Sequence, residues 1–249
     1  MTTLKGKVAL VTGSARGIGR AIAERYAALG AAIAVNFAKD EKSAAETMAA
    51  IVGRGGSAIA IQGDVSKVAE IDHLFRATSE RFGGIDIVVA NAGIELVDQR
   101  LLDFTEADFD RLFGVNTKGA FFTLQRAARH VRDNGRIIYV GSSTTRLPQP
   151  DYALYGASKI APQYLVEALA KLLGHRGVTV NSILPTAIEG AGVYTTGASE
   201  SVREFVRSTR PIARMGTPDD VANAAEYLAG DLASFVSGQH LLLSGGAPA

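Results

Sequence analysis

Short apolar runs alternate with amphipathic stretches along almost the whole chain. The runs predict seven strands, at residues 7–12, 31–36, 57–62, 85–90, 136–140, 178–184 and 239–243. The stretches between them have helical periodicity, at residues 17–29, 40–52, 66–82, 105 to about 131, 152–173 and 217 to about 229. Capping signals mark two helix starts, at Thr105 with Asp108 and at Thr217 with Pro218.

Repeated βα units predict a parallel sheet with right-handed crossovers and helices on both faces. No linker-like stretch divides residues 1–249, so we expect one doubly wound, Rossmann-type α/β domain. The longest segment without periodicity, residues 185–199, follows the sixth strand. Ligands of open α/β sheets bind beyond the carboxyl ends of the strands, so this part of the chain predicts a substrate lid at about 185–215.

Charge and cysteine content exclude several classes of function. The 249 residues contain 26 Lys+Arg, 25 Asp+Glu and no cysteine, which excludes disulfides, thiolate metal sites and cysteine nucleophiles. A net charge of +1 without a basic block argues against nucleic acid or membrane partners. The start of the chain has no apolar signal region and the four histidines are widely spaced, so we expect a cytoplasmic protein without a metal site.

A glycine-rich turn, TGSARGIG at residues 12–19, joins the first strand to the first helix. Glycines allow a backbone to approach a pyrophosphate, and the helix offers free N–H groups and the positive end of its dipole. The position of the turn favours dinucleotide binding over a simple tight turn. The expected contacts are Gly13, Ser14, Arg16, Gly17, Ile18 and Gly19.

The end of the second strand predicts NADP(H) rather than NAD. It carries Asn36 and Phe37 instead of the acid that usually binds the ribose hydroxyls. Arg16 and Lys39 are placed to meet a 2′-phosphate, although both are also compatible with solvated surface cations. After the third strand, Asp64 with Val65 is placed at the adenine edge; the alternative role of Asp64 is a helix cap near Ser66.

Four polar residues are candidates for chemistry. Tyr155 and Lys159 lie four residues apart, on one helix face. Ser142 follows the fifth strand, at the edge where a cofactor would lie. Asn116 stands inside the predicted long helix, where asparagine is a poor helix former, and its alternative role is a polar core residue.

Together with Asn91-Ala92-Gly93 and Gly245-Gly246, these motifs resemble the short-chain dehydrogenase/reductase family over essentially the whole chain. The resemblance implies a strand order of 3-2-1-4-5-6-7, a nicotinamide cofactor and a Ser142/Tyr155/Lys159/Asn116 tetrad. It implies a cofactor groove that also includes Asn91, Ala92, Gly93, Pro185, Thr186 and Ile188. Thr186 replaces the usual glycine after Pro185, and Asp133 stands where carrier-protein reductases usually have a base. Pro162 lies inside the Tyr155 helix and is expected to bend it just beyond Lys159.

The implied reaction is hydride transfer between nicotinamide and a carbonyl or secondary alcohol, with Tyr155 as the general acid or base. A cation about 4 Å from the phenol would lower its pKa by roughly 3 units, so we expect Lys159 to bring Tyr155 near neutrality. The expected pocket for a small to medium substrate is lined by Ile94, Leu147, Gln149, Tyr152, Val193 and Tyr194.

Three alternatives stay open at this point. The first is a 3-oxoacyl-acyl-carrier-protein reductase, which the base at Arg176 would suit. The second is epimerisation or dehydration on the same scaffold. The third is a dinucleotide-binding protein without catalysis, which the presence of both Tyr155 and Lys159 disfavours.

Apolar positions also predict self-association. The helix that contains Tyr155 carries an apolar stripe wider than one sheet face can cover, and the final strand would leave residues 241–243 at an exposed edge. A symmetric homo-oligomer covers both surfaces. We expect a homotetramer, with a dimer as the alternative.

Overall fold

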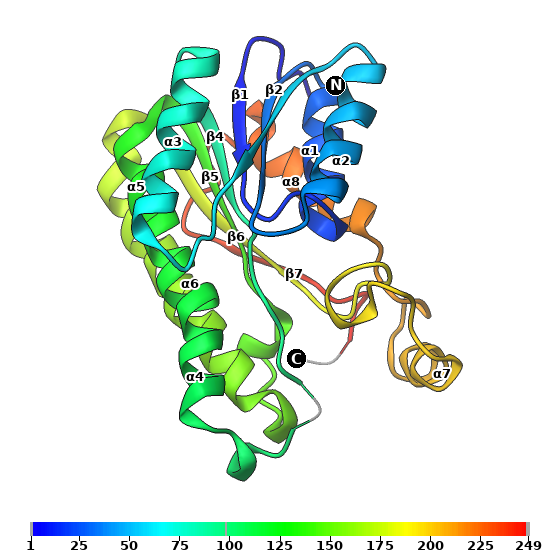
Figure 1. Cartoon of the computed structure of the whole chain (residues 1–249). Helices are drawn as coiled ribbons and strands as arrows, with labels where there is room; N and C mark the ends of the chain where they lie inside the picture. The colour runs from blue at the N-terminus through cyan, green and yellow to red at the C-terminus, as the bar shows by residue number, and fades with distance from the viewer. Residues whose placement is uncertain (1, 98, 248–249) are drawn as a thin grey trace.

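Seven parallel strands form the centre of the protein, in the order β3-β2-β1-β4-β5-β6-β7 (Figure 1). The computed structural model describes residues 2–97 and 99–247. Its sheet confirms the predicted fold class and strand order. The strands are β1 (Val8–Val11), β2 (Ala32–Phe37), β3 (Ser57–Gln62), β4 (Ile85–Ala90), β5 (Val131–Val140), β6 (Thr179–Pro185) and β7 (His240–Leu243).

Helices cover both faces of the sheet (Figure 1). One layer contains α1 (Gly17–Ala28), α2 (Glu41–Gly53) and α8 (Pro218–Ala229), and the other contains α3 (Val68–Phe82), α5 (Ala120–His130) and α6 (Ala153–Leu173). In β1, Ala9 and Val11 pack in the core under α1, α2 and α8, whereas Leu10 packs in the core under α3, α5 and α6. Because successive strand residues face opposite layers, buried strands here are apolar at nearly every position. Within the described residues, no helix is both long and apolar enough to cross a membrane.

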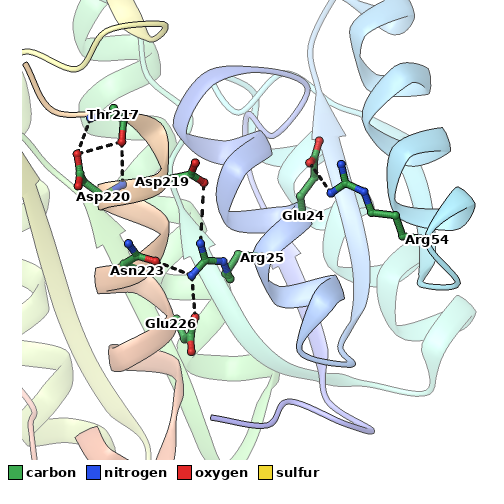
Figure 2. A network of polar contacts seen from close by, with 8 residues as sticks. All are labelled: Glu24, Arg25, Arg54, Thr217, Asp219, Asp220, Asn223 and Glu226. Carbon is green, nitrogen blue, oxygen red and sulfur yellow. Dashed lines mark hydrogen bonds and ion pairs between the residues drawn. The ribbon is translucent and has the colours of Figure 1, made fainter. Parts of the chain in front are cut away.

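Polar contacts fasten α1 to α8 (Figure 2). Arg25 of α1 donates to Asn223 Oδ1 at 2.5 Å and to Glu226 Oε2 at 3.0 Å. At the start of α8, the Thr217 hydroxyl accepts from Asp220 N and the Asp220 carboxylate accepts from Thr217 N. This capping box satisfies two backbone groups that the helix leaves free, and it confirms the predicted start.

The predicted helix from residue 105 to about 131 is interrupted. It consists of α4 (Glu106–Phe113), a π-helical turn (Gly114–Gly119) and α5. The turn carries Asn116, whose side chain forms two hydrogen bonds with the backbone of Ile94. The polar stretch Gly-Val-Asn-Thr-Lys-Gly breaks the apolar pattern here, but the sequence prediction ran one helix through it. The following strand also begins earlier than predicted, since Val131 already pairs with Ile85.

Pro162 lies inside α6, and the helix continues without a break from Ala153 to Leu173. Proline has no N–H to donate to the carbonyl four residues earlier, Ser158 O. The Thr117 hydroxyl, in the π-helical turn, donates to that carbonyl at 2.8 Å instead. A neighbouring element thus supplies the hydrogen bond that the proline removes.

The chain from 186 to 215 leaves the sheet and returns beside it. Its base is closed by a parallel bridge between Ile188 and Gly216, with Glu189 N donating to Gly216 O at 2.9 Å. The loop contains α7 (Glu200–Thr209), a helix that we did not predict. Arg203 of α7 pairs with Glu189, so the helix is held to the base of the loop.

We expect Thr117→Val to lower the free energy of unfolding by about 1–2 kcal/mol, because it leaves the Ser158 carbonyl without a donor. The cost should shrink in a Pro162→Ala background, where residue 162 regains its N–H. Urea unfolding of the two single variants and the double variant measures this coupling. An equal cost of Thr117→Val in both backgrounds would contradict the assignment.

Candidate functional site

The glycine-rich loop lies at the carboxyl end of β1. Gly13 has φ +61°, a left-handed conformation that suits glycine, and its N–H donates to Asn36 Oδ1 at 3.0 Å. Ser14 is also held in place, because its hydroxyl donates to Val11 O at 2.7 Å. Among the described residues, no side chain caps the N-terminus of α1. Its first N–H groups therefore suit an anionic ligand such as a pyrophosphate.

Two asparagines shape this loop. Asn91 Nδ2 donates to Thr12 O at 2.9 Å and to Gly13 O at 3.1 Å. Asn36 is buried, and its Nδ2 donates to Gly63 O at 2.9 Å. The Asn36 side chain therefore supports the loop rather than reaching outward to a cofactor. The ring of Phe37 is buried too, in the core beside α1.

Two cations flank the end of β2. Arg16 and Lys39 are both exposed, and neither forms an ion pair within the part of the chain that the structure describes. Both side chains are consequently available to an anionic group. Asp64 does not cap α3, whose N-cap residue is Lys67; its Oδ1 accepts from Ser66 N at 2.9 Å in the turn before the helix.

Tyr155, Lys159 and Ser142 meet at the carboxyl edge of the sheet, as predicted. Tyr155 and Lys159 lie on successive turns of α6, both buried, with Lys159 Nζ 5.8 Å from the centre of the Tyr155 ring. The same ammonium donates to Val140 O at 3.2 Å. A hydrogen bond joins Ser142 to Tyr155. Strand β5 and helix α6 thus hold the three groups together.

Gly93 makes room for this arrangement. A Cβ atom at this position would lie 2.8 Å from Lys159 Nζ and 3.2 Å from Asn116 Oδ1, closer than packed atoms allow. Only glycine lets the loop after β4 come this near to the ammonium. This explains why the Asn-Ala-Gly motif is part of the site.

Asn116 is completely buried beside Lys159. Its Oδ1 accepts from Ile94 N at 2.9 Å, and its Nδ2 donates to Ile94 O at 2.8 Å and to Ser158 Oγ at 3.0 Å. The role as a polar core residue is therefore observed. An amide oxygen has a second lone pair, so Asn116 can also accept a bond within the site.

Burial has the largest effect on the pKa values of Tyr155 and Lys159. It lowers the pKa of Lys159 to about 8, although the nearby Glu95 carboxylate acts in the opposite direction. Burial also raises the pKa of Tyr155, the negative charge of Glu95 adds to this, and the hydrogen bond with Ser142 lowers it. Our expectation that the pKa of Tyr155 lies near neutrality is therefore wrong for the protein's own groups, because burial and the charge of Glu95 raise it.

The expected pocket residues differ in how far they are exposed. Ile94 is fixed by Asn116, and Val193 and Tyr194 form a 3₁₀ turn of the loop beyond β6. Leu147 and Tyr152 are half-buried, whereas Gln149 is exposed. Pro185 ends β6, and at the expected glycine position Thr186 N still donates to Leu243 O of β7, at 3.2 Å.

Sequence reasoning missed Glu95. Its carboxylate forms a hydrogen bond with Tyr155 and accepts from Val193 N at 2.8 Å. The available signal was a charge inside the otherwise apolar run of residues 94–97, directly after the Asn-Ala-Gly motif. Across residues 2–97 and 99–247, no three His, Asp or Glu side chains gather as a candidate metal site.

Comparisons with known proteins cover almost the entire chain. Residues 13–248 match a family model described as enoyl-(acyl carrier protein) reductase. A hydroxynaphthalene reductase-like protein Arp2 of Metarhizium majus is 37% identical, over 98% of this chain and 96% of that protein.

Two solved structures are also similar to this chain. A short-chain dehydrogenase from Burkholderia cenocepacia in complex with NADP is 38% identical over 99% of both chains, with a TM-score of 0.91. The angucycline C-6 ketoreductase LanV with bound NADP is 36% identical over 98% of this chain and 96% of that chain, with a TM-score of 0.91.

Proposed function

Because the chain belongs to the short-chain dehydrogenase/reductase family, we propose that it is an NADP(H)-dependent carbonyl reductase that uses Tyr155 as its general acid. It is an oxidoreductase of that family, which transfers hydride between a nicotinamide cofactor and a carbonyl. The observation that carries the proposal is the meeting of Ser142, Tyr155 and Lys159 beside the glycine-rich loop.

The residues present fit a dinucleotide. The uncapped N-terminus of α1 suits the pyrophosphate, and the left-handed conformations of Gly13 and Gly17 shape the loop that leads into it. Asn91, Ala92, Lys159, Thr186 and Ile188 would hold the nicotinamide end. The bound cofactor supplies the hydride.

The protein's own groups manage the proton. Burial and Glu95 raise the pKa of Tyr155, so its phenol stays protonated at neutral pH and can donate to the developing alkoxide. The Ser142 hydroxyl binds the same carbonyl oxygen and orients it. The ammonium of Lys159 stabilises the phenolate that the transfer leaves. Asn116 holds a water that returns the proton.

Preference for NADP(H) is supported by the end of β2. The strand presents no acid there, and Arg16 and Lys39 are exposed without an ion pair in the described chain. A carboxylate would repel the 2′-phosphate, whereas these cations would bind it. Two similar structures contain NADP, in agreement with this choice.

The substrate we propose is a ketone or aldehyde of small to medium size. Relatives named for hydroxynaphthalene and angucycline reduction favour cyclic ketones. The alternative, a carrier-bound 3-oxoacyl group, is less well supported. Arg176, the remaining basic position, donates to Asp133 Oδ1 at 2.7 Å and to Ala128 O at 2.9 Å. An arginine engaged in this way is a poor docking point for an acidic carrier protein.

Two apolar surfaces support a homotetramer. On α5 and α6 an apolar groove is lined by Phe121, Gln125, Ala128, Arg129, Leu165, Leu169, Leu172 and Leu173. Tyr164 beside it is 75% exposed. A separate surface near β7 exposes Leu232, Phe235 and Leu241. Two self-complementary surfaces on one chain give a tetramer with twofold axes. The cytoplasmic location and the lid role of residues 185–215 also stay proposals.

The function is tested by following NADPH absorbance against ketones, aldehydes and an acyl-carrier substrate. Tyr155→Phe should lower turnover by ~10²-fold or more while NADPH binding, measured by fluorescence, stays near wild type. The ring and the packing of α6 remain, and only the proton donor is lost. Near wild-type turnover of Tyr155→Phe would remove the tyrosine from its role.

Cofactor preference is tested at Arg16. The wild type should use NADPH over NADH by at least ~10-fold in kcat/KM, and Arg16→Ala should lower the NADPH value by about tenfold without changing the NADH value. Arg54→Ala is the matched control, since Arg54 is an exposed arginine that pairs with Glu24. A wild type that prefers NADH, or equal losses with both cofactors, would contradict the assignment.

Light scattering tests the oligomer. The wild type should have about four times the chain mass of 26.1 kDa, and Leu172→Glu should give a smaller, folded species. Leu172 is 61% exposed on a single chain, so the change places no charge in the core. A 26.1 kDa particle at micromolar concentration would refute self-association.

A further inference from the structure

Glu95 connects the catalytic tyrosine to the loop beyond β6. It is half-buried, two residues after Gly93. Its carboxylate is hydrogen-bonded to Tyr155, and its Oε2 accepts from Val193 N at 2.8 Å. A charged group thus touches both the proton donor and the 3₁₀ turn that carries the expected pocket residues Val193 and Tyr194.

The loop backbone lies directly against this carboxylate. Gly192 has φ +57°, and a Cβ atom there would lie 2.6 Å from Oε2 and 2.9 Å from Oε1 of Glu95. Glycine suits this left-handed turn, and any larger residue would force the carboxylate to move. Glu95 therefore lies between the phenol of Tyr155 and the turn of Gly192–Tyr194, a position from which its carboxylate can contact a group next to the reacting carbonyl.

The charge of Glu95 is not balanced by a direct ion pair. In the described part of the chain, no lysine, arginine or histidine nitrogen pairs with it. From α6 it faces Tyr155 and, at longer range, the Lys159 ammonium. An ionised carboxylate only accepts hydrogen bonds, so it needs donors from its surroundings.

Substrate binding would change the donors available to Glu95. The Tyr155 phenol has one O–H, which must point at the substrate carbonyl oxygen during reduction. Glu95 then loses that donor and keeps Val193 N–H. A half-buried carboxylate short of a donor is unfavourable, unless the substrate itself supplies one.

We propose that Glu95 determines substrate specificity, by accepting a hydrogen bond from a hydroxyl carried next to the reacting carbonyl. The enzyme would then select cyclic hydroxy ketones over their counterparts without the hydroxyl, and reject oxo acids by charge repulsion. This inference rests on the proposed carbonyl reduction and names the substrate class of the same site.

The test compares wild type, Glu95→Leu and Glu95→Gln on three bicyclic ketones. One carries a hydroxyl next to the carbonyl, one carries hydrogen there, and one carries a carboxylate. The wild type should favour the hydroxy ketone over the unsubstituted ketone by ~10-fold or more in kcat/KM. Glu95→Leu should bring this ratio near one, and Glu95→Gln should admit the oxo acid. An unchanged ratio in Glu95→Leu would overturn the proposal.

A pH profile separates this role from a purely structural one. Because Glu95 raises the pKa of Tyr155, Glu95→Gln should move the rise of alcohol oxidation with pH to lower pH. Glu80→Gln is the control: this exposed carboxylate lies on α3, outside the proposed site, and pairs with Arg76. The control should keep both the wild-type ratio and the wild-type profile.

A binding measurement distinguishes failure of the proposed carbonyl reduction from failure of the role proposed for Glu95. Quenching of NADPH fluorescence measures the affinity of each ketone for the complex without turnover. If no carbonyl is reduced but the hydroxy ketone binds selectively to the wild type and not to Glu95→Leu, the proposed function fails and the role of Glu95 stands. If ketones are reduced without selectivity, the role of Glu95 is refuted and the function stands.

Discussion

The amide side chains of Asn91 and Asn116 fix the loop after β4, and the rest of the site is placed against that loop. Asn91 ties it to the glycine-rich turn through Thr12 O and Gly13 O. Asn116 ties it to α6 through Ile94 and Ser158. A loop held at one side by the half-buried amide of Asn91 and at the other by the buried amide of Asn116 cannot shift without leaving polar groups unsatisfied. The dinucleotide-binding half and the catalytic half of the site therefore keep one relative position.

The rigid site holds Lys159 in a buried position that disfavours its positive charge. Moving the pKa of Lys159 from 10.5 to about 8 corresponds to about 3 kcal/mol of disfavoured charge. The cost applies below about pH 8, and it fades as pH rises toward 10.5 because the folded lysine has already lost its proton. Sites that are preorganised for chemistry commonly have such a stability cost. Here the cores on both faces of the sheet offset it.

Periodicity predicted the parallel sheet and its two helical layers, and the family resemblance supplied the strand order and the grouping of Ser142, Tyr155 and Lys159. They failed where side chains replace backbone hydrogen bonds. The π-helical turn at Asn116 and the bond from Thr117 to Ser158 O both depend on contacts between distant segments. Glu95 escaped notice for a similar reason, since only the fold brings Val193 and Tyr155 to it. A pattern of neighbours in sequence contains no such information.

The closed base of the loop beyond β6 has a consequence for how such a protein diversifies. Ile188 and Gly216 pair with each other, so the ends of the segment stay together whatever lies between them. The entropy of closing a loop changes only slowly with its length. Insertions, deletions or exchanges between these two anchors that keep Gly192 and Val193 would leave the sheet and the contact of the loop with Glu95 intact. The segment is consequently a suitable place for sequence changes that alter substrate preference while the catalytic residues stay the same.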